Sequence, residues 1–235
     1  MKVEIWSDVL CPWCYIGKRD FEQALGEFKH KDKVEVMWKS FELDPAAQID
    51  YEGNLYDLLS SKYHVSIERA RQMTGPLVER AAASGLTYNM DIAKATNSFD
   101  AHRLIHLAAK HGLQQAVIEL LSAAYLTSGK HIGHHETLIQ IGFEAGLDKA
   151  EITEMLESDE YAEAVRKDEY EAQNLRVRGV PFFLTDQKYS ISGAQPKEVF
   201  SEALEKIWDE LYPKVKAVAI SGNVQCDASG VCETS

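Results

Sequence analysis

The sequence predicts an α/β fold that is interrupted by an all-helical insertion. Strand, helix and strand patterns follow one another in residues 1–46, and helical patterns fill the next stretch, to about residue 174. Strand patterns then return after Pro181. The simplest account is that the two ends of the chain form one sheet and that the helical residues are inserted between them.

The first elements are predicted from a change of period. Residues 2–8 alternate apolar and polar side chains around Trp6, which is typical of a short strand. From Pro12 large apolar side chains recur at helical spacing, with charged residues on the opposite face. Residues 34–38 have the pattern of a second strand. This order indicates a βαβ unit.

The middle of the chain is predicted to be helical, with glycine and polar breaks between the helices. The expected helices are Ser66–Ser84, Asn97–His111, Gln115–Leu126, Glu136–Glu144 and about Asp159–Leu175. After them, residues 182–184 and 189–191 flank Asp186-Gln187 as a hairpin, and Pro196 opens a last helix that runs to Leu211.

These patterns divide the chain into four parts. They are a first part of the α/β domain, the helical insertion, a second part of the α/β domain, and a flexible tail that contains two cysteines: residues 1–46, 47–174, 175–213 and 214–235.

Charge and composition exclude several classes of partner. There are 25 Lys and Arg against 37 Asp and Glu, a formal charge of −12, and this charge would repel a nucleic-acid backbone or an anionic membrane. The amino terminus has no secretory signal pattern, and no apolar run of about 18 residues is present. We therefore expect a cytoplasmic protein, in which cysteines are more often catalytic or metal-binding than structural disulfides.

The stretch Cys11-Pro12-Trp13-Cys14 is the main candidate site. Cysteines three positions apart at a helix start are neighbours on one face, so a disulfide can close between them. Unpaired backbone N–H groups and the helix dipole favour a thiolate at Cys11, the predicted nucleophile. Pro12 suits the first helical position, Trp13 offers an aromatic surface beside the thiols, and Cys14 is the predicted resolving thiol.

This pattern predicts a dithiol–disulfide oxidoreductase that passes through a mixed disulfide with its substrate. Asp8, three residues before Cys11, is either a proton acceptor for a thiol or a solvated loop acid or cap. A structural alternative is a zinc site in which Cys226 and Cys232 complete the ligand set of Cys11 and Cys14. The second pair has five intervening residues, which is wider than the usual zinc knuckle.

Several separated motifs resemble one family. They are Cys11 to Gly17, Asn97 to Leu104, Gly179 to Phe183 and Ser192 to Gln195. Together they resemble the DsbA-like thioredoxin superfamily, and its FrnE-like branch in particular. The resemblance covers about residues 1–212 and implies a thioredoxin-like fold, with an inserted helical domain.

The resemblance also implies a substrate site beside the cysteines. Val180-Pro181 is expected to be a cis peptide bond that packs next to them, and Val180 is expected to present its backbone to an extended substrate segment. Disulfide-containing proteins or low-molecular-weight thiols are the implied partners, with no cofactor. The sequence does not fix the oligomeric state.

A related branch leaves an alternative function open. Glutathione-dependent isomerases of the 2-hydroxychromene-2-carboxylate type and kappa-class glutathione transferases resemble this architecture, commonly with serine at the first cysteine position. Under that alternative glutathione is a co-substrate. The presence of both Cys11 and Cys14 favours the dithiol enzyme. FrnE-like proteins can also carry a carboxy-terminal cysteine pair, which implies that Cys226 and Cys232 exchange electrons with the first pair.

Weaker candidates come from histidines and an arginine. His131, His134 and His135 could bind a metal, although they are expected in a loop and first helical turn with solvated side chains, and no metal is expected to be required. His102 and Arg103 could face the active-site cleft, but a surface or interdomain pair is the plainer interpretation.

Overall fold

The computed structural model describes residues 1–213, 224–226 and 232–234. A four-stranded mixed sheet lies at its centre, in the order β2-β1-β3-β4. The strands are β1 (Lys2–Ser7), β2 (Glu35–Ser40), β3 (Phe182–Thr185) and β4 (Tyr189–Ser192). β1 pairs in parallel with β2 and antiparallel with β3. The two ends of the chain therefore form one sheet, as the sequence predicts.

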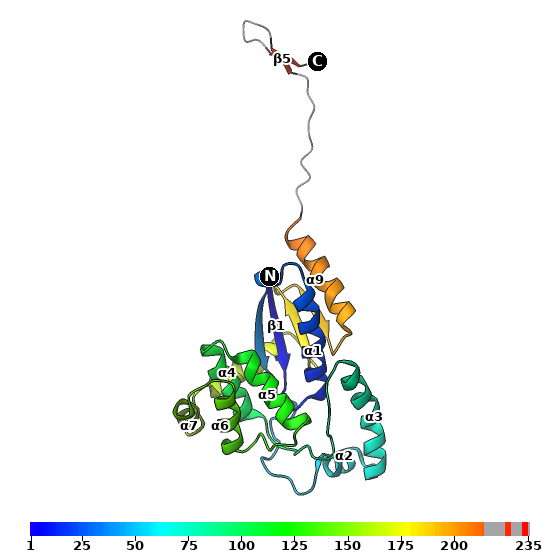
Figure 1. Ribbon diagram of the computed structural model, residues 1–235, viewed down its shortest axis with the longest axis vertical. Coiled ribbons are helices and arrows are strands. Elements are labelled where there is room, and N and C mark those ends of the chain that lie inside the picture. The colour runs from blue at the N-terminus through cyan, green and yellow to red at the C-terminus, as the bar shows by residue number, and fades with distance from the viewer. Residues whose placement is uncertain (214–223, 227–231, 235) are drawn as a thin grey trace.

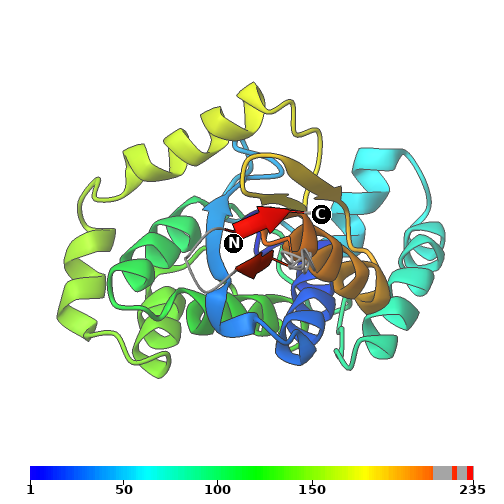
Figure 2. The ribbon, with the colours of Figure 1, turned by 90° about the horizontal axis from the view of Figure 1, so that it is seen from above.

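Helices cover both faces of this sheet (Figure 2). α1 (Pro12–Glu27) and α9 (Lys197–Leu211) lie together on one face, and α8 (Ala162–Asn174) lies on the other. Phe21 of α1 and Phe200 of α9 meet Phe183 of β3, with ring centroids 5.4 and 4.7 Å from that of Phe183. On the opposite face the buried Trp6 donates its indole N–H to the carbonyl oxygen of Asp168 in α8 at 2.9 Å.

The remaining helices form the insertion between β2 and β3 (Figure 1). They are α2 (Leu55–Tyr63), α3 (Ile67–Ala83), α4 (Phe99–Lys110), α5 (Gln114–Leu126), α6 (His135–Glu144) and α7 (Lys149–Leu156), followed by α8. The structure thus has the predicted class, an α/β fold with an all-helical insertion. The division of the chain into four parts stays a prediction.

Two of these helices are additional to those predicted. α2 begins with a capping box, in which the side chain of Asn54 accepts from the N–H groups of Tyr56 and Asp57, and the carboxylate of Asp57 accepts from the N–H of Asn54. α7 begins at Asp148, whose carboxylate accepts two N–H groups in the same way. One further short element, the 3-10 helix η1 (Lys31–Lys33), precedes β2.

Two short strands occur where the sequence predicts only a flexible tail. β5 (Val224–Cys226) and β6 (Cys232–Thr234) pair antiparallel. Among the described residues, no helix is both long enough and apolar enough to cross a membrane.

Candidate active site

The two cysteines of the CPWC stretch lie where the sequence predicts, at the start of α1. Cys11 is the N-cap residue and has an extended backbone, and Pro12 takes the first helical position. The carbonyl oxygen of Cys11 accepts the N–H of Cys14 at 3.0 Å, which closes the first turn. Both cysteines are buried and free, whereas Trp13 between them is 44% exposed. The helix start therefore places a dithiol beneath an exposed aromatic side chain.

The entrance to β3 lies against this dithiol. The Val180–Pro181 peptide bond is cis, and the Cys11 thiol donates a weak hydrogen bond to the carbonyl oxygen of Val180, with Sγ to O at 3.7 Å. These residues are 169 positions apart in the chain, so the pairing of β1 with β3 builds the site from both ends of the sequence.

The two thiols have different environments. Burial raises the pKa of Cys14 well above its ordinary value, and the hydrogen bond and negative charge of Cys11 raise it further. A hydrogen bond with the Ser7 side chain and one from the backbone of Asp8 oppose this shift only in part. In the reduced protein Cys14 is therefore the thiol that keeps its proton.

Asp8 is buried next to the turn that carries Cys11 and is not a solvated loop acid. Only 1% of its surface is exposed. Its carboxylate accepts the N–H of Leu10 at 3.0 Å and the N–H of Leu43 at 2.8 Å, and its backbone carbonyl accepts the N–H of Cys11 at 3.0 Å. Asp8 thereby fixes the turn that enters α1 and the segment that leaves β2.

The two candidates on α4 have different roles. His102 is buried, and its Nε2 lies 3.6 Å from the nearer carboxylate oxygen of Asp8, beyond hydrogen-bond distance. Arg103 is also buried, but it serves the end of α7: its guanidinium donates to the carbonyl oxygens of Met155, Ser158 and Glu160. These contacts join α4 to the end of α7 and to the segment that follows it, so Arg103 holds parts of the insertion together.

One tyrosine that contacts the CPWC turn was not predicted from the sequence. Tyr88, from the segment between α3 and α4, donates its hydroxyl to the carbonyl oxygen of Pro12 at 2.6 Å. Its ring stacks on that of Tyr15. Burial raises the pKa of Tyr88, and so does the charge of Cys11. An aromatic side chain in a connecting segment has no periodic pattern that could have identified it.

The remaining candidates make no hydrogen bond or ion pair with the dithiol in the described part of the structure, or have side chains outside it. His131 and His134 converge on Asp50, and His135 pairs instead with Asp100 at 2.9 Å. The backbones of Cys226 and Cys232 are register partners in β5 and β6. Their side chains lie outside the described part of the structure, so the expected second redox pair stays a prediction.

A buried dithiol at a helix start, facing the first residues of a neighbouring strand on a mixed sheet, defines an oxidoreductase-type site of the thioredoxin fold. The chain belongs to the family described as the DSBA-like thioredoxin domain, whose sequence model matches residues 2–205.

Three solved structures are similar to it. A probable DsbA oxidoreductase from Streptomyces coelicolor is 39% identical, with a TM-score of 0.84 and coverage of 99% of this chain and 98% of that one. A 2-hydroxychromene-2-carboxylate isomerase is 16% identical, with a TM-score of 0.67 over 90% of this chain and 98% of that one. The cytosolic disulfide reductase DsbM from Pseudomonas aeruginosa is 18% identical, with a TM-score of 0.60 over 89% and 100%. The last two show the fold alone.

Proposed function

We propose that the protein is a thiol–disulfide oxidoreductase that acts through Cys11 and Cys14. The observation that carries this proposal is the position of Cys11: it is the N-cap residue of α1, and its sulfur lies 3.7 Å from the carbonyl oxygen of Val180. Unpaired N–H groups at a helix start stabilise a thiolate. The neighbouring strand entrance offers backbone groups to a substrate segment.

In the reductive direction the Cys11 thiolate attacks one sulfur of a substrate disulfide. That bond breaks, a mixed disulfide forms, and the leaving sulfur takes a proton. Cys14 then loses its proton and attacks the sulfur of Cys11. The products are the Cys11–Cys14 disulfide and a fully reduced substrate, so two electrons pass from the protein to the substrate. The oxidative direction is the reverse of these steps.

The substrate class follows from how the site would bind. Val180 offers a carbonyl oxygen beside Cys11, and Trp13 offers an exposed ring on the same helix turn. Backbone pairing with apolar contact tolerates many sequences. We therefore propose disulfide-containing proteins or low-molecular-weight thiols as partners. DsbM, which shares the fold, has also been solved with glutathione.

The test is the reduction of insulin by the purified protein, with dithiothreitol as electron donor. We expect Cys11→Ser to reduce insulin only at the background rate. With dithiothreitol removed after reduction, Cys14→Ser should instead accumulate a mixed disulfide with insulin that mass spectrometry detects, because its resolving thiol is missing. Circular dichroism should show that both variants are folded. A Cys11→Ser protein with full activity would exclude this mechanism.

A glutathione-dependent isomerase or transferase is the second candidate, and the shared fold of 2-hydroxychromene-2-carboxylate isomerase favours it. Such an enzyme would activate glutathione and would not need Cys14. The two candidates differ in one measurement. Saturable, glutathione-dependent turnover of a chromene substrate that survives in Cys14→Ser supports the isomerase, whereas insulin reduction that requires both cysteines supports the dithiol enzyme.

For Cys226 and Cys232 we retain the proposal that they exchange electrons with Cys11 and Cys14. It rests on the FrnE-like resemblance. Replacing both tail cysteines by serine should slow the reductive recycling of the oxidised protein. Unchanged recycling, with no mixed disulfide between the two pairs, would contradict it.

A further inference from the structure

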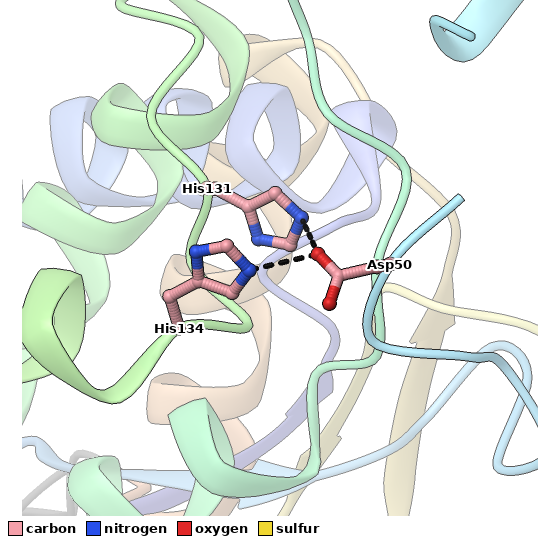
Figure 3. A group of neighbouring side chains, drawn as sticks. All are labelled: Asp50, His131 and His134. Carbon is pink, nitrogen blue, oxygen red and sulfur yellow. Dashed lines mark hydrogen bonds and ion pairs between the residues drawn. The ribbon is translucent and has the colours of Figure 1, made fainter. Parts of the chain in front are cut away.

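Three side chains of types that bind metals, from two segments far apart in the chain, meet at one point (Figure 3). Asp50 lies in the segment between β2 and α2, and His131 and His134 lie between α5 and α6. One carboxylate oxygen of Asp50 is 3.2 Å from Nε2 of His131 and 2.8 Å from Nε2 of His134. One ligand atom from each residue lies within 4.8 Å of the others. The arrangement brings two imidazoles and one carboxylate to a single point.

The backbone holds the two histidines in this arrangement. The N–H of His134 donates to the carbonyl oxygen of His131 at 3.2 Å, and this turn puts both rings on one side, where they stack with centroids 3.8 Å apart. Gly133 within the turn lies so close to the side chains of Thr96 and Ile49 that a Cβ there would clash with them. Only glycine lets the turn approach this closely.

The segment that carries Asp50 is held from the other side. The hydroxyl of Thr96 donates to the carbonyl oxygen of Ile49 at 2.7 Å, and the side-chain amide of Asn97 donates to the carbonyl oxygen of Ala47 at 3.2 Å. Asp50 itself is 73% exposed at its side chain, and His134 is about half exposed. The cluster is therefore anchored by its backbone and open to ions from solvent.

We propose that Asp50, His131 and His134 bind a divalent transition-metal ion such as Zn²⁺. Zinc bonds to imidazole nitrogen and carboxylate oxygen are about 2.0–2.2 Å long, so ligand atoms around a tetrahedral ion lie about 3.3–3.6 Å apart. The 3.2 Å distance from Asp50 to His131 is close to this spacing, and the 2.8 Å distance to His134 would have to lengthen when the ion binds. Two imidazoles and one carboxylate form a ligand set used by zinc and by other first-row metals, with positions left for water.

The ion would tie the segment after β2 to the helical insertion. That segment is already bound near its start, where the N–H of Leu43 donates to the carboxylate of Asp8 beneath the dithiol. A metal at Asp50 would fix it a second time, seven positions further along the chain. This tether does not depend on the chemistry of Cys11 and Cys14, so it stands or falls separately from the proposed function.

The test is calorimetric titration of the full chain with Zn²⁺, using a protein in which all four cysteines are serine. Without thiols, any zinc bound cannot belong to a cysteine site. We expect saturable binding of one ion per chain. His131→Ala and His134→Ala should each weaken it by about tenfold or more, because each removes a direct ligand. His135→Ala is the matched control: this neighbouring histidine pairs with Asp100, and its loss should leave the affinity unchanged.

Two results would overturn the proposal. One is the absence of saturable binding up to about 1 mM Zn²⁺, an affinity too weak for a site. The other is equal affinity in the parent protein and in the double variant His131→Ala with His134→Ala. Hydrogen exchange provides a second measurement, because Zn²⁺ should slow amide exchange in residues 43–54 of the parent and not of the double variant. Amide exchange rates in residues 43–54 that are the same with and without Zn²⁺ would contradict the tether.

Discussion

Gly17 of α1 lies directly against Pro181: a Cβ at Gly17 would be 2.8 Å from Cγ of Pro181. Real Cβ atoms do not approach other atoms this closely, and the neighbour here is part of a rigid ring. The glycine of the CPWCYIG stretch therefore allows the helix that carries the dithiol to pack against the strand entrance beside it.

From this contact we expect Gly17→Ala to displace Pro181 and Val180 from Cys11 and to lower insulin reduction by about tenfold or more, since small displacements at a reacting centre are costly. Gly26→Ala is the control on the same helix. No atom lies within 4 Å of a Cβ there, so it should keep full activity and gain about 0.5–1 kcal/mol of stability. Full activity in Gly17→Ala would contradict the role of this contact.

The high pKa of Cys14 predicts selective alkylation. The thiolate is the reactive form, so iodoacetamide at about pH 7 should modify Cys11 of the folded, reduced protein and leave Cys14 unmodified. Peptide mass spectrometry measures both sites. In urea both cysteines should react, which controls for peptide recovery. Equal labelling of the two in the folded protein would show that their environments do not differ as described.

Buried phenols predict a loss of stability in alkali. Burial raises the pKa of Tyr125 above its ordinary value of about 10, and the charges of Asp8 and Cys11 add to the shift. Below that value both states keep the proton and the stability is fully present. As the pH rises above it, the unfolded chain ionises and the folded protein does not, so the free energy of unfolding falls by about 1.4 kcal/mol per pH unit for each such phenol.

Tyr125→Phe should therefore reduce the slope of stability against pH between about pH 10 and pH 11. Urea unfolding at several pH values measures this slope. Tyr170→Phe is the control, because that side chain is exposed on α8, and its slope should equal that of the parent. A Tyr125→Phe protein with the slope of the parent would contradict the assignment.

The ion pairs between α1 and α5 predict a loss of stability in acid, whereas the buried phenols predict a loss in alkali. Glu119 of α5 accepts hydrogen bonds from Lys18 and from the Tyr15 hydroxyl, and Lys18 is almost wholly buried. Burial would raise the pKa of Glu119, but these hydrogen bonds outweigh it and lower the pKa. Its contribution is therefore present above the unfolded value of about 4.3 and is lost as the pH falls through the folded value.

We expect Glu119→Gln to lower the free energy of unfolding by about 1–3 kcal/mol at neutral pH, because Lys18 loses a charged partner. The difference from the parent should shrink as the pH falls below the unfolded value of about 4.3, because the contribution of the ionised carboxylate is lost in acid. Glu151→Gln, at an exposed pair with Lys110, is the control and should cost less than Glu119→Gln. A difference that does not change with pH would exclude the ionised carboxylate as its cause.

Local patterns in the sequence were sufficient for the dithiol and for the frame that carries it. The start of α1 at Cys11 and Pro12 was predictable from these residues alone, because proline is over-represented at the first position of a helix. α2 has a local pattern of the same kind, because Asn54 and Asp57, three residues apart, form a capping box. This helix was nevertheless not among those predicted.

Partners far apart in the chain could not be predicted in this way. Asp8 was expected to be a proton acceptor, a solvated loop acid or a cap, and the backbone N–H 35 positions away that its carboxylate also accepts was not foreseen. His134 is as solvated as expected, but the meeting of His131 and His134 with Asp50, which precedes His134 by 84 positions, was not foreseen. No periodicity within one segment specifies such contacts, since they depend on how the segments pack.

The 169 positions between Cys11 and Val180 have a consequence for the making of each molecule. Translation proceeds from the amino terminus at about 5–20 residues per second, so about 10–30 s pass between the synthesis of the first residue and that of the second. For that interval the nascent chain carries both thiols without the strand that covers them. A newly made molecule therefore meets the thiols and oxidants around the ribosome before the residues that lie beside its own dithiol have been made.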